Sequence, residues 1–185
     1  ILSRKPDWDY ILSIAKRNNV FPLIAWNLQK NFSALLPNEI KNQMSQFLQA
    51  HTQNNLFLTS KLIEIVNLLD KSGISVLPFK GTILAMSAYK NLALRQYCDL
   101  DILVKPKNFD EATKVLIDTG YIATSRANWL KRKVLFFTHK KDIVFVGSDS
   151  HVCIELHWKL SGSHFSLPFE ISQLWGRLEK LNLAG

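Results

Sequence analysis

Two aspartates separated by a single residue are the most suggestive chemical feature of the sequence. Asp99 and Asp101 lie in the run Cys98-Asp-Leu-Asp-Ile-Leu-Val104, whose apolar residues predict a β-strand. Side chains two positions apart on a strand point to the same face, so both carboxylates should lie side by side. Carboxylates that close repel each other, and a divalent cation would remove the conflict because hard cations prefer oxygen ligands. The alternative is a strand end whose aspartates simply face water.

A second feature is the turn Lys80-Gly81-Thr82, between a predicted strand that ends at Phe79 and a predicted helix over residues 83–89. Glycine lets the backbone approach a ligand closely, and free amides at a helix start attract phosphate. Lys80 could add a charge and Thr82 a hydroxyl contact. The turn lacks the Gly-x-x-x-x-Gly-Lys pattern of a Walker A loop. An ordinary strand-to-helix turn is the alternative.

A third feature is the alternating run His151-Val-Cys-Ile-Glu-Leu-His-Trp158, which predicts another strand. One face of this strand would carry the polar side chains of His151, Cys153, Glu155 and His157. A buried glutamate needs a partner, and a metal shared with Asp99 and Asp101 would supply one. The alternatives are an edge-strand glutamate paired with a lysine, and a zinc site formed by the two histidines and the cysteine.

Basic residues could bind phosphates at two further places. Arg95 precedes Asp99 by four residues and could neutralise a phosphate or pair with that aspartate. A second group surrounds Trp129 and consists of Arg126, Lys131, Arg132 and Lys133. This cluster could bind nucleic-acid phosphates while the tryptophan stacks on a base, or it could be a solvated hairpin.

The overall composition limits the class of protein. The 185 residues include 47% hydrophobic and 21% charged residues, which excludes a disordered chain, a coiled coil and a collagen-like fibre. The net charge of +8 fits either solubility or an anionic partner. No apolar run reaches the roughly 18 residues of a membrane span, so no membrane association is expected. Neither a signal peptide nor a disulfide framework is evident, so we expect free cysteines and a cytoplasmic location.

The elements that would position these residues fall into two regions. Residues 1–72 are predicted to be a helical N-terminal region, and residues 73–185 an α/β domain. Helices are predicted over residues 7–16, 21–29, 37–71, 83–89 and 109–119, and strands over 74–79, 97–104, 134–139, 142–146 and 151–158. A partly helical tail is predicted over residues 167–183. The expected fold is therefore α/β (α+β), with a mixed sheet flanked by helices.

Three motifs together resemble those of a known superfamily. They are Leu77-Pro-Phe-Lys-Gly81, Arg95-x-x-x-Asp99-Leu-Asp101-Ile-Leu-Val104 and Ile154-Glu-Leu-His-Trp158. Over roughly residues 60–160 the chain resembles the polymerase-beta-like nucleotidyltransferases, and more narrowly their bacterial "nucleotidyltransferase family protein" branch. The resemblance implies transfer of a nucleoside monophosphate from a nucleoside triphosphate by a two-metal mechanism with Mg²⁺, or with Mn²⁺ as the alternative ion. It also implies further C-terminal helices, so we expect this chain to be a piece of a longer protein.

The resemblance assigns roles to these residues. Asp99 and Asp101 would bind metal, and Glu155 would be the third carboxylate, near the base that activates the acceptor hydroxyl. Gly81 would contact the triphosphate. We also expect nucleotide contacts from Lys80, Thr82 and Arg95. His157 would lie next to the metal ligands.

Two functions follow as hypotheses. The first is an enzyme that uses a small molecule, a protein side chain or an RNA end as acceptor. The alternative is a catalytically inactive module of the same fold that binds a nucleotide or nucleic acid. The presence of all three acids favours the enzyme. A Lys-Gly-Thr turn, where the superfamily usually has Gly-Gly or Gly-Ser, counts for the alternative.

Overall fold

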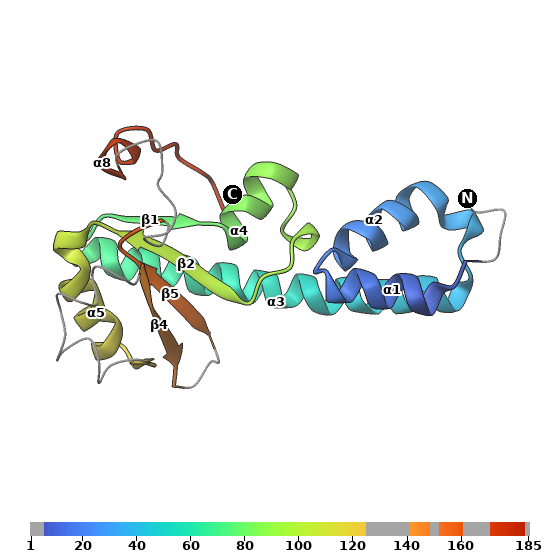
Figure 1. The fold of residues 1–185 in the computed structure, drawn as a ribbon, viewed down its shortest axis with the longest axis horizontal. Helices are drawn as coiled ribbons and strands as arrows, with labels where there is room; N and C mark the ends of the chain where they lie inside the picture. The colour runs from blue at the N-terminus through green and yellow to red at the C-terminus, as the bar shows by residue number, and fades with distance from the viewer. Residues whose placement is uncertain (1–5, 125–140, 149–151, 161–170, 184–185) are drawn as a thin grey trace.

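A five-stranded mixed sheet and one long helix dominate the computed structural model, which describes residues 6–124, 141–148, 152–160 and 171–183. The long helix, α3 (Asn38–Lys71), runs along most of the molecule, with two N-terminal helices at one end and the sheet at the other (Figure 1). The predicted α+β class with a mixed sheet and flanking helices is confirmed.

The N-terminal helices form where the sequence predicts them. Helix α1 (Trp8–Arg17) is capped by Asp7, whose side chain accepts a hydrogen bond from the Tyr10 amide at 3.0 Å. Helix α2 (Phe21–Phe32) extends three residues beyond its predicted end. Together with the first turns of α3, these helices enclose a core of Leu12, Ala15, Phe21, Ala25, Leu36, Ile40 and Met44. Helix α3 ends before Gly73, whose φ of +75° suits glycine.

The sheet has the strand order β1-β2-β5-β4-β3. Its strands are β1 (Val76–Phe79), β2 (Asp99–Val104), β3 (Tyr121–Ala123), β4 (Asp142–Gly147) and β5 (Cys153–His157). Strands β2 and β5 are parallel, and the other neighbours are antiparallel. The two strands that carry the predicted acids are therefore adjacent in the sheet.

One face of the sheet is apolar and packs on helices. Alternate residues of the two central strands, among them Ile102 and Ile154, are buried against α3 and α5 (Phe109–Asp118). The Phe109 ring meets the Trp158 ring edge-on, with centroids 4.5 Å apart. Successive side chains of β2 and β5 point to opposite faces, so the polar residues between these apolar ones face the other side of the sheet.

Several elements differ from the predictions. The helix expected over residues 83–89 begins earlier, as α4 (Gly81–Leu84), and continues as a π-helical turn over Ala85–Tyr89. Strand β3 was not predicted, because three residues are too short to show a periodic pattern. The other short helices are Ser33–Leu35, Leu92–Leu94, Pro106–Asn108 and α8 (Ile171–Leu174). The strand predicted over residues 134–139 lies outside the described residues.

The division into residues 1–72 and 73–185 stays a prediction. Helix α3 contributes to both hydrophobic cores, because Met44 belongs to the N-terminal core while Leu58 and Leu69 pack with the sheet. We propose that the two regions share this helix.

Candidate metal and nucleotide site

The pairing of β2 with β5 brings the predicted acids to one face. Asp101 is directly opposite Glu155, and Asp99 is opposite Cys153. Paired residues on neighbouring strands point to the same side, so the three acids share the face that is turned away from α3. The parallel register thus brings together carboxylates that lie more than fifty positions apart in the chain.

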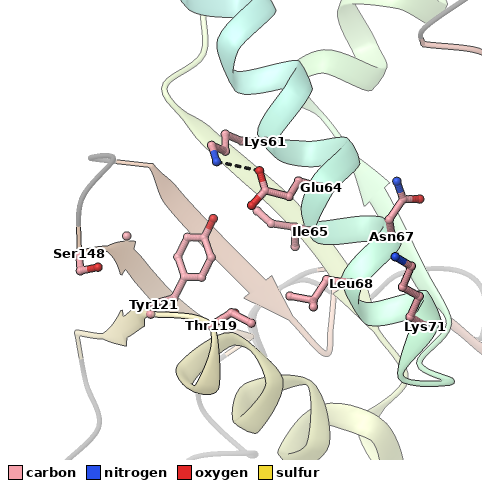
Figure 2. Close-up of a pocket in the computed structure, with 11 residues that line it drawn as sticks. Lys61, Glu64, Ile65, Asn67, Leu68, Lys71, Thr119, Tyr121 and Ser148 are labelled. Carbon is pink, nitrogen blue, oxygen red and sulfur yellow. Dashed lines mark hydrogen bonds and ion pairs between the residues drawn. The ribbon is translucent and has the colours of Figure 1, made fainter.

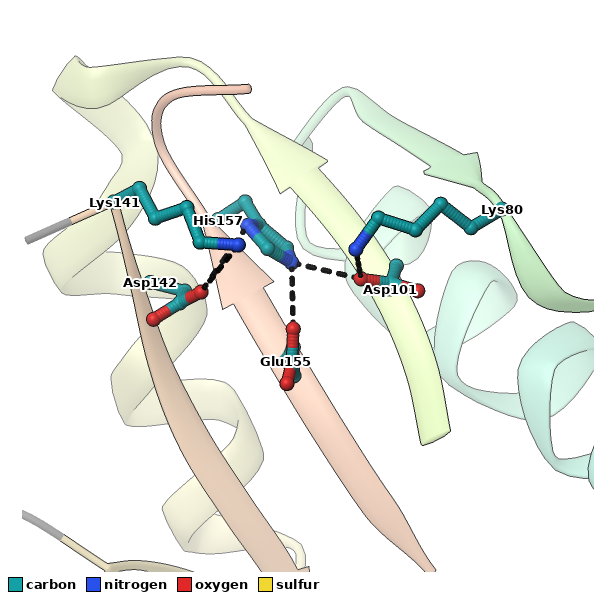
Figure 3. A network of polar contacts seen from close by, with 6 residues as sticks. All are labelled: Lys80, Asp101, Lys141, Asp142, Glu155 and His157. Atoms are coloured by element: carbon teal, nitrogen blue, oxygen red, sulfur yellow. Dashed lines mark hydrogen bonds and ion pairs between the residues drawn. The ribbon is translucent and has the colours of Figure 1, made fainter. Parts of the chain in front are cut away.

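A nitrogen completes the group around Asp101. His157 Nε2 lies 3.0 Å from Asp101 Oδ1 and 3.3 Å from Glu155 Oε2 (Figure 3). One ligand atom from each of these three residues lies within 4.8 Å of the others, which suits a single metal ion. Within the part of the chain that the structure describes, Asp99 does not join this group. Two carboxylates and an imidazole therefore form the most compact candidate metal site.

Lys80 reaches the same aspartate from the other side. Its Nζ lies 2.5 Å from Asp101 Oδ1 (Figure 3). The preceding residue, Phe79, pairs with Asp101 across β1 and β2. The Lys80 backbone has φ +56°, a left-handed conformation that is uncommon for lysine. This bend turns the chain from β1 directly into α4 and positions the ammonium group at the carboxylates.

The pKa values of Asp101 and Glu155 are shifted in opposite directions. Burial alone would raise the pKa of Asp101, but hydrogen bonds from His157 and Lys80 outweigh it and hold the pKa below its ordinary value. Burial raises the pKa of Glu155, and the negative charges of Asp101 and Asp142 raise it further. Asp101 is therefore the more readily ionised of the two carboxyl groups.

The turn after Lys80 needs its glycine. A Cβ on Gly81 would lie 3.3 Å from Tyr97 Cδ2, which is a tight contact, and 3.5 Å from the Asp99 carbonyl oxygen, which is an ordinary one. The φ of +21° at Gly81 also disfavours any residue with a side chain. The neighbouring Thr82 is buried, and its hydroxyl donates to the Tyr97 hydroxyl at 3.0 Å. Gly81 thus lies against the first residues of the acidic strand, while the Thr82 hydroxyl is engaged within the protein.

Sequence reasoning missed the residue of α3 that holds the segment around Arg95. Asn55 is fully buried and donates to the carbonyl oxygens of Leu92 at 2.6 Å and Arg95 at 3.0 Å. The Arg95 guanidinium lies 5.9 Å from the centroid of the Tyr97 ring. No ion pair joins Arg95 to Asp99 among the described residues. The available signal was the polar spacing of His51, Asn55 and Thr59 on an otherwise apolar helix face.

Asp142, the first residue of β4, was not predicted from the sequence as part of the site, and Lys141, which the sequence places in a hairpin turn, directly precedes it. Asp142 Oδ2 lies 3.6 Å from His157 Nδ1, and Lys141 Nζ lies 3.2 Å from the same oxygen (Figure 3). They extend the polar network on the acidic face across β5 to β4.

Some predicted residues lie outside the described part. They are His151 and the basic group Arg126, Lys131, Arg132 and Lys133 around Trp129. The cysteines Cys98 and Cys153 are both described, and both are free.

A separate pocket of about 490 Å³ lies between α3 and the edge of the sheet formed by β3 and β4 (Figure 2). Lys61 and Glu64 form an ion pair of 2.7 Å beside the ring of Tyr121. None of its lining residues belongs to the carboxylate group, so this pocket is distinct from the candidate metal site.

The mixed sheet, with carboxylates on adjacent strands beside a strand–turn–helix, is consistent with a nucleotidyltransferase fold. The family described as "Uncharacterised nucleotidyltransferase" matches residues 4–185, and the chain belongs to this family. Comparison with curated proteins and with solved structures found no match. Among the described helices, none has the length and apolarity that crossing a membrane requires.

Proposed function

We propose that this protein is a metal-dependent nucleotidyltransferase that moves a nucleoside monophosphate from a nucleoside triphosphate to a hydroxyl group of an acceptor. The observation that carries the proposal is the direct pairing of Asp101 with Glu155 on the polar face, with Asp99 on the same side. Membership of a nucleotidyltransferase family supports it independently.

Asp99, Asp101 and Glu155 would hold the divalent metal, Mg²⁺ or alternatively Mn²⁺. The residues present fit such an ion: ligand atoms of Asp101, Glu155 and His157 lie within 4.8 Å of one another, and Asp101 is nearly inaccessible to water. When bound, the ion would neutralise phosphate charge and make the acceptor hydroxyl more acidic. The proposed site therefore offers carboxylate oxygens, the ligands that Mg²⁺ accepts.

The chain's own groups would act around the triphosphate. Lys80, at the junction of β1 and α4, would pair with phosphate oxygens, and Arg95 would add a second positive charge. Gly81 would let the backbone approach the phosphates, and Thr82 would act by holding Tyr97. Glu155, which is partly exposed, would accept the proton of the acceptor hydroxyl on the carboxylate oxygen that does not hold the ion. The acceptor oxygen forms a bond to the α-phosphorus, the α–β bridging bond breaks, and pyrophosphate leaves.

A second candidate function is an inactive module that binds a nucleotide or nucleic acid. The observation that favours it is the engagement of the Thr82 hydroxyl within the protein. The basic residues Arg126, Lys131, Arg132 and Lys133 would then bind nucleic acid. For the enzyme, we propose a small molecule, a protein or RNA as the acceptor. We also propose a cytoplasmic location, which the two free cysteines support.

Ligand-induced stabilisation tests the proposed site. Mg²⁺ with a non-hydrolysable nucleoside triphosphate should raise the Tm by about 5–10 °C at a hundred times the Kd, because the ligand binds only the folded state. Asp101→Asn should lose most of this rise, and Asp118→Asn, an exposed aspartate at the end of α5, should retain it. Equal rises in the native protein and the Asp101→Asn variant would show that Asp101 holds no metal–nucleotide complex.

A further inference from the structure

We propose that His157 is itself a metal ligand, that Asp142 orients its ring, and that the site for this reason binds Mn²⁺ more tightly than Mg²⁺. The inference rests on the proposed metal-dependent function and adds the identity of the nitrogen ligand and the preferred ion. It differs from the site expected from sequence, in which oxygen atoms alone hold Mg²⁺ and His157 only lies nearby.

The first step is the crowding of oxygen atoms around one ring nitrogen. His157 Nε2 faces Asp101 Oδ1 at 3.0 Å and Glu155 Oε2 at 3.3 Å. This arrangement is favourable only when Nε2 carries a proton or when a cation lies among the three atoms. A bound cation would take the Nε2 lone pair together with the two carboxylate oxygens.

The second step is the state of the other ring nitrogen. The His157 side chain is completely buried, and its Nδ1 makes no hydrogen bond with any described residue. Asp142 Oδ2 lies 3.6 Å away, within reach of a small shift of either side chain. When Nε2 binds a metal, the remaining ring proton is on Nδ1, where it points to this carboxylate. A histidine that ligates a metal typically donates its other N–H group in this way.

The third step is the rigidity of the imidazole. Phe79, at the end of β1, meets the His157 ring edge-on with centroids 4.9 Å apart. His157 also lies within β5, where it pairs with Leu103 and Asp142 on either side. The ring therefore has little freedom to turn away from the carboxylates, and its orientation is set before an ion arrives.

The fourth step is the preference that this ligand set creates. Mg²⁺ strongly favours oxygen ligands, whereas Mn²⁺, a transition-metal ion, accepts an imidazole nitrogen more readily than Mg²⁺ does. One nitrogen beside two carboxylates should therefore shift the balance from Mg²⁺ toward Mn²⁺.

The test uses Mn²⁺ alone as the probe with the full chain. Loss of the free-ion electron paramagnetic resonance signal measures the Kd, and competition with Mg²⁺ measures the preference. Electron spin-echo modulation then detects a nitrogen bonded to bound Mn²⁺. We expect nitrogen modulation in the native protein and a Kd for Mn²⁺ about tenfold or more below that for Mg²⁺. Bound Mn²⁺ without nitrogen modulation would overturn the inference.

Variants separate the ligand from its positioning residue. His157→Gln should abolish the nitrogen signal and reduce the preference for Mn²⁺, while circular dichroism verifies that the variant folds. Asp142→Asn should keep the nitrogen signal but weaken Mn²⁺ binding by about 10- to 100-fold. The exposed control Asp118→Asn should bind as the native protein does. Native-like binding by Asp142→Asn would contradict the positioning role.

A double variant distinguishes positioning from simple charge attraction. Once His157→Gln has removed the imidazole, Asp142→Asn should have little further effect on the Mn²⁺ Kd. An undiminished effect would mean that Asp142 acts through its charge, and the positioning role would be wrong. Absence of any Mn²⁺ or Mg²⁺ binding would instead reject the metal site of the proposed function, so the two failures can be told apart.

Discussion

We expect the Asp101→Asn variant to transfer nucleotide at a rate lower than that of the native protein by on the order of a hundredfold or more. The substitution keeps the shape of the side chain but removes the negative charge on which Lys80 and His157 converge. Transfer assays with a labelled nucleoside triphosphate under saturating Mg²⁺ or Mn²⁺ measure the effect. The Asp118→Asn variant, which removes a charge from the exposed end of α5, should be unaffected. Near-native transfer by Asp101→Asn would remove Asp101 from the reaction.

The same variant should also lose stability at neutral pH. The folded-state pKa of Asp101 is lowered, so its ionised form contributes stability above the unfolded pKa, and this contribution is lost as the pH falls through the folded pKa. Urea unfolding measures the free energy of unfolding of both proteins at neutral pH and at a pH well below the ordinary aspartate pKa. The difference in this free energy between the native protein and the variant should be smaller at the acidic pH. The loss of transfer must be measured at temperatures where both proteins are folded.

Lys80→Met should change metal binding and transfer in opposite directions. The Lys80 ammonium group forms an ion pair with Asp101 Oδ1, so a divalent ion that binds this oxygen must displace the ammonium group. Removal of the ammonium group should therefore tighten metal binding by about fivefold. Transfer should nevertheless fall by on the order of a hundredfold, because a positive charge facing the proposed triphosphate is lost. Calorimetric metal titration and the transfer assay measure the two effects.

The exposed Lys114 of α5 provides the matched control for this substitution. Lys114→Met removes the same charge with the same side-chain change, and both quantities should stay at native values. If the Lys80→Met variant bound metal more weakly and transferred nucleotide at the native rate, both expected changes would be absent and the proposed role of Lys80 would be wrong.

Much of the acidic face could be predicted from the sequence because strands alternate strictly. Asp99 and Asp101 share a face by their spacing alone, and Glu155 follows from the alternation of its own run. The pairing that brings Asp101 opposite Glu155 depends on strand order and register, which the spacing within one strand does not determine. Resemblance to a family, not periodicity, supplied that connection.

The remaining contacts depend on conformations that a linear pattern does not show. The ion pair of Lys80 with Asp101 requires the left-handed backbone at Lys80, and lysine rarely adopts it. Asp142 reaches His157 only because β4 lies antiparallel to β5, which the sequence leaves open. Asn55 contacts Arg95 across a separation of forty residues, so its role appears only when the chain is folded.

The most direct test of the proposed function follows the position of the transferred label. The protein is incubated with each nucleoside triphosphate labelled at the α-phosphorus or at the γ-phosphorus, with Mg²⁺ or Mn²⁺ and a cell extract as the source of acceptors. A nucleotidyltransferase should move the α-label onto an acceptor and release the γ-label as pyrophosphate, and Asp101→Asn should slow both by on the order of a hundredfold or more. Transfer of the γ-label to an acceptor, or tight nucleotide binding without transfer of either label, would contradict the proposed function.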